Sequence, residues 1–218
     1  MTPELGIIDI HTHVLPEEPG TALVCIGCGP LLQEDGHWFS AGLHPWDVSE
    51  RFDDQLRPLE ALLANPVVRA VGECGFDTLG GTPRQLQEKA FVRQVELSEK
   101  FGKPMILHVV RDFDSVIRLH RELKPTLQWL IHGFRGAPRQ MEQLLHQDLH
   151  ISLGLHCNPE TLKQIPESEL FLETDGKCHI GDVIDNAARV RSSSAETIRR
   201  TILGNCDMLL SGQAAALK

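Results

Sequence analysis

Apolar residues along this chain of 218 residues gather into eight runs of strand length. The runs are continuous rather than alternating with polar positions, which is typical of parallel strands covered on both faces. Segments with helical spacing separate the later runs, and each ends at a proline, glycine or asparagine. The predicted strands are 6–14, 22–27, 38–43, 67–74, 104–110, 127–134, 149–155 and 170–175, and the predicted helices are 52–66, 82–104, 112–125, 137–148, 158–166, 182–190 and 195–210.

The alternation of strand and helix predicts the fold class. A parallel α/β protein with right-handed crossovers satisfies this order, and eight strand candidates indicate a TIM-type (β/α)8 barrel that occupies residues 1–218 as a single domain. The first two gaps, 15–21 and 28–37, are shorter than the roughly dozen residues that a parallel crossover usually needs. We therefore expect a barrel shortened in its first β/α units. Ser194 is the expected N-cap of the last helix.

Composition excludes some classes of function. With 30 acidic and 21 basic residues the chain has a formal net charge of −9, so no overall positive field attracts it to a polyanion. Any contact with nucleic acid has to be local, brief or bridged by metal. The sequence contains no apolar run of about 18 residues and no signal-peptide pattern, so we expect a soluble, cytoplasmic protein with no membrane partner. Nothing in the sequence specifies an oligomeric state.

The six cysteines are scattered along the chain, and several lie within apolar runs. This usage is typical of reduced intracellular thiols. Cys25 and Cys28 have C-x-x-C spacing, which leaves a redox or zinc role open, but no second pair completes a four-ligand site. A disulfide framework is not expected.

Metal-competent side chains end five of the predicted strands. In a β/α barrel the C-terminal ends of all strands open onto one face, where active sites are built. We therefore expect six side chains to converge there: His11 and His13 from the first strand, Glu73 from the fourth, His108 from the fifth, His132 from the sixth and Asp175 from the eighth.

Four imidazoles and two carboxylates suit Zn, Mn, Fe, Ni or Mg. A carboxylate such as Glu73 can bridge two cations about 3.5–4 Å apart, and Asp175 can hold one cation and orient or deprotonate water. Bound metal lowers the pKa of water to about 7, which favours hydrolysis. Each residue alone has an ordinary alternative, namely a backbone hydrogen bond for a histidine, an ion pair for Glu73 or an N-cap for Asp175. Six such residues at five strand ends favour the metal interpretation.

The order of six segments resembles the TatD family of metal-dependent hydrolases, relatives of the amidohydrolase superfamily. The segments are "IDIHTHV", "AGLHPW", "AVGECGFD", "KPMILHVVRDFD", "IHGFRG" and "LFLETDG". The resemblance extends from about residue 6 to residue 210. It implies a barrel with a dinuclear metal centre whose ligands are His11, His13, Glu73, His108, His132 and Asp175.

The same resemblance implies residue roles and an activity. Glu73 is the expected bridging carboxylate, and Asp175 is expected to handle the proton of water. His44 matches the histidine of the family's G-x-H-P motif, which implies a contact with phosphate or substrate, although a helix-initiating loop before Pro45 is the alternative. The implied activity is phosphodiester hydrolysis on DNA by a Mg-dependent deoxyribonuclease, often an exonuclease.

Two departures from the family pattern affect the prediction of the substrate. Members commonly read H-x-R-D after the fifth strand, whereas Arg111 is displaced here by one position, which turns a strand side chain to the other face. We therefore expect Arg135, in "HGFRG", to meet phosphate through bidentate hydrogen bonds. The segment after Asp175 also differs and is expected to shape substrate choice.

The leading prediction is a two-metal phosphodiesterase that acts on DNA with two divalent ions, Mg, Mn or Zn. One alternative keeps the metals but takes a small-molecule substrate, namely a phosphoester, amide or lactone, which suits the acidic composition. A third hypothesis is a non-catalytic metal-binding barrel.

Overall fold

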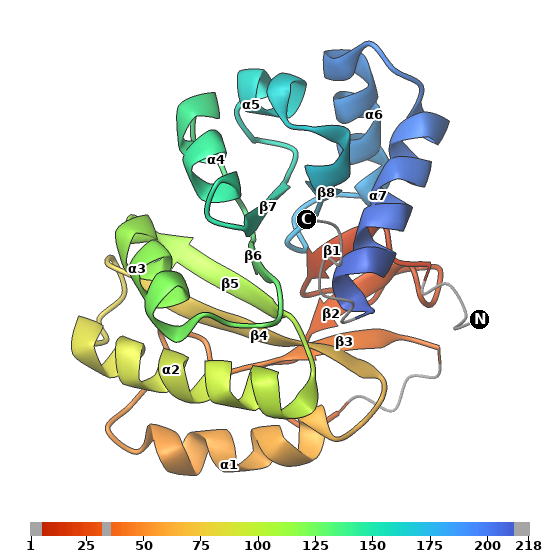
Figure 1. The fold of residues 1–218 in the computed structure, drawn as a ribbon. Coiled ribbons are helices and arrows are strands. Elements are labelled where there is room, and N and C mark those ends of the chain that lie inside the picture. Colours follow the sequence, from red (N-terminus) through yellow and green to blue (C-terminus); the bar gives the residue numbers. More distant parts are fainter. Residues whose placement is uncertain (1–5, 32–35, 212–218) are drawn as a thin grey trace.

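The computed structural model describes residues 6–31 and 36–211, which form a parallel barrel surrounded by helices (Figure 1). Eight strands pair in chain order, and each pairing between consecutive strands is parallel. The strands are β1 (Asp9–Thr12), β2 (Ala22–Cys25), β3 (Trp38–Ala41), β4 (Val68–Asp77), β5 (Met105–Val110), β6 (Trp129–Ile131), β7 (Leu149–Leu153) and β8 (Phe171–Leu172).

The first and last strands meet and bring the barrel close to full closure. Just beyond β8, the backbone N–H of Asp175 donates to the carbonyl of His11 on β1 over 3.1 Å. Thr174 donates from its backbone and its hydroxyl to the carboxylate of Asp9, over 3.1 and 2.7 Å. The prediction of a TIM-type (β/α)8 barrel is therefore confirmed.

Helices cover the outside of the barrel from the third unit onward (Figure 1). They follow the predicted segments because each has an apolar stripe that packs against the sheet. Ser194 caps the last helix as predicted, since its hydroxyl accepts from the backbone of Thr197 over 3.1 Å. The helices are α1 (Phe52–Leu63), α2 (Arg84–Phe101), α3 (Phe113–Leu123), α4 (Pro138–Leu145), α5 (Pro159–Gln164), α6 (Ile180–Arg191) and α7 (Ala195–Leu210), and a 3-10 turn, η1 (Glu167–Glu169), precedes β8.

The first two connections carry no helix in the described residues. Residues 13–21, between β1 and β2, form bends and turns, and so do the described residues 26–31 and 36–37 between β2 and β3. The predicted shortening of the first β/α units is therefore confirmed. Bends and turns thus replace the helices of the first two units in the described residues.

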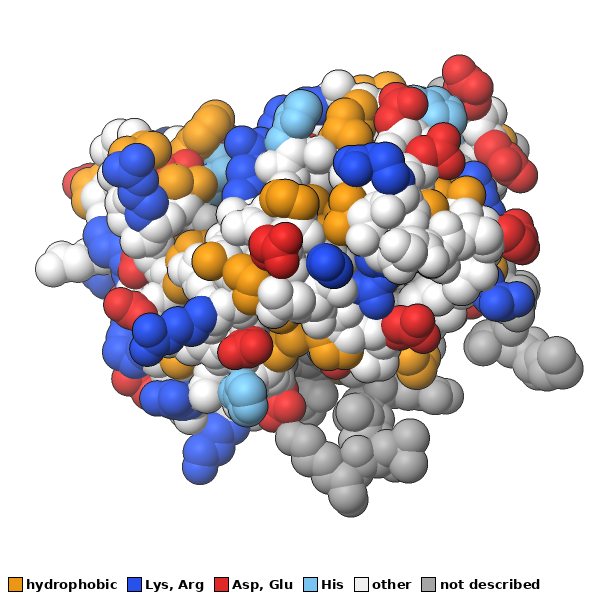
Figure 2. All heavy atoms as spheres, turned by 90° about the horizontal axis from the view of Figure 1, so that it is seen from above, with side chains coloured by type: hydrophobic (Ala, Val, Ile, Leu, Met, Phe, Trp, Pro, Cys, Tyr) orange, Lys and Arg blue, Asp and Glu red, His pale blue; other side chains and the backbone are white. Residues whose placement is uncertain are grey.

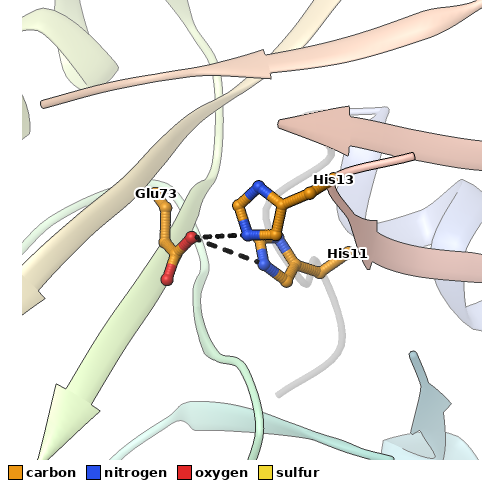
Figure 3. A group of neighbouring side chains, drawn as sticks. All are labelled: His11, His13 and Glu73. Carbon is orange, nitrogen blue, oxygen red and sulfur yellow. Dashed lines mark ion pairs between the residues drawn. The ribbon is translucent and has the colours of Figure 1, made fainter. Parts of the chain in front are cut away.

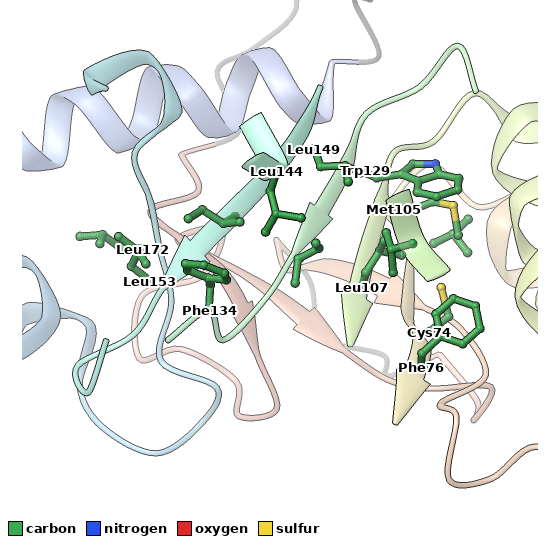
Figure 4. Close-up of a cluster of buried hydrophobic side chains, with 14 of the residues drawn as sticks. Cys74, Phe76, Met105, Leu107, Trp129, Phe134, Leu144, Leu149, Leu153 and Leu172 are labelled. Carbon is green, nitrogen blue, oxygen red and sulfur yellow. The ribbon is translucent and has the colours of Figure 1, made fainter. Parts of the chain in front are cut away.

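The core lies between the strands and the surrounding helices, where apolar side chains from both pack together (Figure 4). Phe91 of α2 contacts the rings of Phe76 on β4 and Trp129 on β6, with ring centroids 4.9 and 5.1 Å apart. All three rings are at most 1% exposed. Burial of one such side chain contributes about 1.5–3 kcal/mol, so this layer fixes α2 against the strands that carry the polar site.

The outer surface mixes charges. Figure 2 shows Lys and Arg side chains interspersed with Asp and Glu over one face of the molecule.

Among the described residues, no helix combines the length and the apolar composition that a membrane span requires. A single domain over residues 1–218 stays a prediction.

Strand β4 is longer than predicted. It continues to Asp77 because residues Cys74 to Asp77 pair with Leu107 to Val110 of β5, which is itself a long strand. Glu73 therefore lies inside β4, whereas the prediction placed it at the strand's end. Strand β8 is shorter than predicted and ends at Leu172, so Asp175 lies in the segment that follows it.

Candidate metal centre

The structure brings together the six residues that the sequence predicts as metal ligands. They meet at the mouth of the barrel onto which the C-terminal ends of the strands open, and Figure 3 shows His11 and His13 pointing toward the carboxylate of Glu73. The contributing positions are His11 in β1, His13 just after it, Glu73 in β4, His108 in β5, His132 just after β6 and Asp175 after β8.

Glu73 lies at the centre of the group, and its two oxygens face different histidines. Its Oε2 is 3.5 Å from Nε2 of His11 and 3.3 Å from Nε2 of His13. Its Oε1 is 2.9 Å from Nδ1 of His108 and 2.7 Å from Nε2 of His132. The carboxylate therefore stands between two sets of nitrogen donors.

Asp175 lies on the same side as the β1 histidines. Its Oδ1 is 3.6 Å from Nε2 of His11 and 3.4 Å from Nε2 of His13. Its other oxygen, Oδ2, accepts from the ammonium of Lys177. The Asp175 side chain is 21% exposed, so it contacts both the buried cluster and solvent.

The backbone of β4 turns Glu73 toward the mouth of the barrel. The register of β4 against β5 shifts between Val71 and Cys74, and such irregularities re-aim a side chain. Gly72 lies within the shift and Gly75 just after it, with φ of 151° and 139°, and a Cβ at these positions would clash with the carbonyl oxygens of Ile106 and His108. The two glycines of "GECG" thus allow β4 to approach β5 closely on either side of Glu73.

Carboxylates and imidazoles shift one another's pKa. Burial alone would raise the pKa of Glu73, but hydrogen bonds from His108, His13 and His132 hold it well below its usual range. Hydrogen bonds that His13 donates to Asp175 and Glu73 raise its pKa to about 9. Burial and the nearby His132 lower the pKa of His11. Positive charge at the cluster is therefore favoured near Glu73 and Asp175.

Two histidines have surroundings that fit a bound cation. His108 has a carboxylate oxygen at each ring nitrogen, Glu73 Oε1 at 2.9 Å and Asp77 Oδ2 at 3.0 Å, whereas a neutral imidazole has only one N–H to donate. His11 is fully buried, and neither of its ring nitrogens has a hydrogen-bond partner among the described residues. Buried polar atoms normally have partners, so the surroundings of both histidines favour a bound cation.

Three overlapping groups offer ligand atoms close enough to hold an ion. In each, one nitrogen or oxygen per residue lies within 4.8 Å of the others. The groups are His11 with His13 and Glu73, His11 with His132 and Asp175, and His44 with Glu73 and His108.

His44 and Arg135, the predicted substrate contacts, lie in different surroundings. Nε2 of His44 is 3.5 Å from Oε1 of Glu73, so the structure places His44 within the cluster itself. Arg135 is exposed and lines a small cavity of about 80 Å³ together with Asp175 and Lys177. The structure therefore brings His44 to the centre of the site and Arg135 to its edge.

Sequence reasoning missed two buried carboxylates behind the histidines. Asp77 accepts from His108, and Glu173 lies 3.6 Å from Nδ1 of His132 while accepting from the hydroxyl of Ser152. Both are at most 3% exposed. A carboxylate at the end of an apolar run, as in "ECGFD" and "LFLETD", was the available signal for them.

The fold and the site together define a class, a parallel (β/α)8 barrel with a histidine and carboxylate cluster at the mouth where barrel enzymes carry their active sites. The sequence model described as TatD related DNase matches residues 31–210. The chain belongs to this family, as its resemblance predicts.

Named relatives agree with this assignment. The chain is 31% identical over 204 residues to the protein named 3'-5' ssDNA/RNA exonuclease TatD of Edwardsiella piscicida, which covers 79% of this chain and 77% of that relative. It is 35% identical over 152 residues to the protein of the same name from Citrobacter rodentium, covering 63% of this chain and 56% of that relative. The match to the second relative thus spans little more than half of its length.

Two crystal structures share the fold. YJJV, a TatD homologue from Escherichia coli, superposes with a TM-score of 0.81 at 20% identity and covers 95% of this chain and 98% of that chain. A TatD family hydrolase from Entamoeba histolytica superposes with a TM-score of 0.77 at 16% identity, with the same coverage.

Proposed function

We propose that this protein is a metal-dependent nuclease that hydrolyses phosphodiester bonds at the ends of single-stranded DNA or RNA. The observation that carries the proposal is the position of Glu73, whose two carboxylate oxygens face different histidines. A shared carboxylate of this kind suits a pair of cations rather than one. The names of the TatD relatives support the substrate class.

Each side of Glu73 has a set of residues to hold a divalent ion. By their distances to the two oxygens, His11 and His13, with Asp175 beside them, lie on the Oε2 side. His108 and His132 lie on the Oε1 side, with His44 next to them. Nitrogen and carboxylate donors accept Mg, Mn or Zn, and we propose two such ions. When bound, divalent ions neutralise phosphate charge and lower the pKa of coordinated water.

The chain's own side chains divide the remaining tasks. Asp175 is partly exposed and held through Oδ2 by Lys177, so it is placed to orient water and to accept its proton. Arg135 lies at the edge of the same cavity, where a guanidinium donates two parallel hydrogen bonds to phosphate. His44 stands against Glu73 and contacts the substrate from the β3 side.

The test is cleavage of an end-labelled single-stranded oligonucleotide with Mg or Mn present. We expect activity in the wild type and a loss of at least about 100-fold in Glu73→Gln and in Asp175→Asn, since each removes charge from the cluster. Glu88→Gln is the matched control, because Glu88 pairs with Arg84 and Arg118 away from the site. Equal cleavage by all four proteins would refute the proposal, and bound metal without cleavage would favour a non-catalytic metal-binding barrel.

A metal-dependent hydrolase of a small phosphoester, amide or lactone is the second candidate. The net charge of −9 and the mixed charges on the face in Figure 2 favour it. Neither observation indicates a continuous positive surface that would bind the backbone of a nucleic acid. Salt separates the two candidates. The nuclease loses kcat/KM on an oligonucleotide as salt rises, whereas turnover of a small ester with no oligonucleotide cleavage would support the second candidate.

A further inference from the structure

Trp46 is an exposed aromatic side chain at the mouth of the barrel, in the loop that follows β3. Its side chain is 61% exposed, although a tryptophan usually buries most of its large apolar surface. None of the site residues discussed so far offers a flat apolar face to solvent. The exposure of this ring therefore requires an explanation.

The exposed ring is nevertheless held in place. The indole Nε1–H donates to Oδ2 of Asp77 over 2.7 Å, and Asp77 is buried with two further backbone donors, Leu79 and Gly80, on its other oxygen. The backbone of Trp46 donates to Nδ1 of His44 over 3.2 Å and accepts from the hydroxyl of Thr82 over 3.3 Å. A side chain fixed at its polar edge but open to solvent is pre-organised to receive a ligand.

Glycine at position 80 lets the loop after β4 approach this ring. A Cβ at Gly80 would lie 2.6 Å from Cδ1 of Trp46, so any larger residue would push the indole aside. The loop after β4 therefore packs closely against the Cδ1 edge of the indole.

The ring adjoins the candidate metal centre. Its centroid is 4.8 Å from that of His44 and 5.9 Å from that of His108, and both histidines contact Glu73. A ligand whose phosphate sits at the cluster therefore has its next chemical group within reach of the indole.

Other exposed apolar side chains lie in loops that follow strands at the same end of the barrel. Leu79 follows β4 and is 67% exposed, while Val14 and Leu15 follow β1 and are 57% and 36% exposed. Apolar side chains are thus exposed in the loops after β1, β3 and β4, the strands that carry His11, His44 and Glu73 or lead to them. The combination suits a substrate with an anionic group and a planar apolar group, as in a nucleotide.

We infer that Trp46 is a stacking platform for the nucleobase next to the scissile phosphate. This inference rests on the proposed nuclease function and adds a specific base contact to it. Stacking of a base on an aromatic face tolerates every base, so the platform supports end cleavage without sequence preference. The hydrogen bond to Asp77 links the platform to His108 through one carboxylate.

The experiment compares three single-stranded oligonucleotides of one sequence, one intact, one with an abasic 3'-terminal position and one with an abasic penultimate position. For the wild type we expect kcat/KM to fall about 5- to 150-fold on one of the two abasic substrates, the range that corresponds to one stacked base. In Trp46→Ala the intact and abasic substrates should be cleaved at similar rates. Trp46→Phe should keep the preference, and Trp46→Leu, which lacks a π-face, should lose it.

Met208→Ala is the matched control for Trp46→Ala. Met208 is 60% exposed on α7, next to residues that contact the start of β4 at the opposite end of the barrel, so this variant should keep the wild-type preference. A preference for the intact end that survives in Trp46→Ala or in Trp46→Leu would overturn the inference. Equal loss on intact and abasic substrates in Trp46→Ala, with the ratio unchanged, would show a structural role instead.

A binding measurement separates this inference from the proposed function. Trp46 is far more exposed than the buried Trp129, so an intact oligonucleotide added in the presence of chelator should quench tryptophan fluorescence more than an abasic one, and Trp46→Phe should abolish that difference. Cleavage with no dependence on Trp46 in either assay would leave the nuclease in place and refute the platform. Base-dependent quenching without cleavage under any metal would refute the nuclease and keep the platform.

Discussion

Asp77 fixes the orientation of His108. Its Oδ2 lies 3.0 Å from Nε2 of His108, which directs Nδ1 of the same ring toward Oε1 of Glu73 at 2.9 Å. When a cation is bound, Nε2 would carry the proton for Asp77 and the lone pair of Nδ1 would face the cluster. A carboxylate behind a ligating histidine sets its tautomer and increases its basicity in this way.

Replacement of Asp77 should therefore weaken metal binding. In Asp77→Asn we expect the affinity for Mn or Zn to fall about 10- to 100-fold, because the amide holds His108 less firmly and does not increase its basicity. Isothermal titration of chelator-treated protein measures the change, and Asp54→Asn, at an exposed position on α1, is the control. Unchanged affinity in Asp77→Asn would show that His108 is oriented by packing alone.

Metal should stabilise the folded protein. Buried His11 has no hydrogen-bond partner for either ring nitrogen among the described residues, and a bound cation would coordinate the lone pair of one of them. At a concentration about 100-fold above Kd the gain is about 2.7 kcal/mol, which corresponds to a rise in Tm of roughly 5–10 °C for a chain of this size. Thermal unfolding with and without chelator measures it. Glu73→Gln should show a much smaller rise, and a rise as large as that of the wild type would argue against a shared carboxylate.

The contact between Asp9 of β1 and Thr174, just after β8, should contribute to the stability of the barrel. Thr174→Val keeps the shape of the side chain but leaves Oδ2 of buried Asp9 without the donor that lies 2.7 Å away. We expect the free energy of unfolding to fall by about 1–3 kcal/mol, the cost of an unsatisfied buried group. Urea unfolding measures this change. Thr78→Val, at an exposed hydroxyl, should change stability by less than about 0.5 kcal/mol.

Stability should rise with pH through the titration of Lys103. Burial, and to a smaller extent Arg69, lowers the pKa of this ammonium from 10.5 to about 8, although it donates to the carbonyls of Asn65 and Val68. Between pH 8 and 10.5 the unfolded chain binds more protons here than the folded chain, so the free energy of unfolding increases with pH. Lys103→Met removes this contribution. Its urea unfolding should show a flatter pH dependence than the wild type, and parallel curves would contradict the assignment.

The barrel could be predicted from sequence because its strands are continuous apolar runs, a signal that does not depend on distant residues. The missing helices near β1 and β2 were equally visible, since the gap at 15–21 is too short for a crossover. The end of β4 was not, because its extension to Asp77 depends on pairing with β5, a contact between residues about 30 positions apart.

Some residues of the candidate site could likewise be predicted from the sequence, and others could not. His11, His13 and Asp175 could be placed together because strand ends of a parallel barrel share one face. Asp77 and Glu173 could not, because their roles depend on which ring nitrogen of His108 or His132 each faces, and that orientation arises only when the strands are assembled. The approach of His44 to Glu73 likewise reflects the path of a loop.

The shared position of Glu73 also constrains how this site could diverge. Under the proposed ligand assignment, a substitution at Glu73 affects both ions at once. A related protein that keeps a single ion is therefore not expected to result from a substitution at Glu73. Such a protein must arise through changes confined to one side of Glu73, such as loss of His13 from the β1 side or of His132 from the β6 side. The histidines that remain on one side of Glu73 would then hold the single ion together with its carboxylate. The second carboxylate oxygen would be free to bind another group.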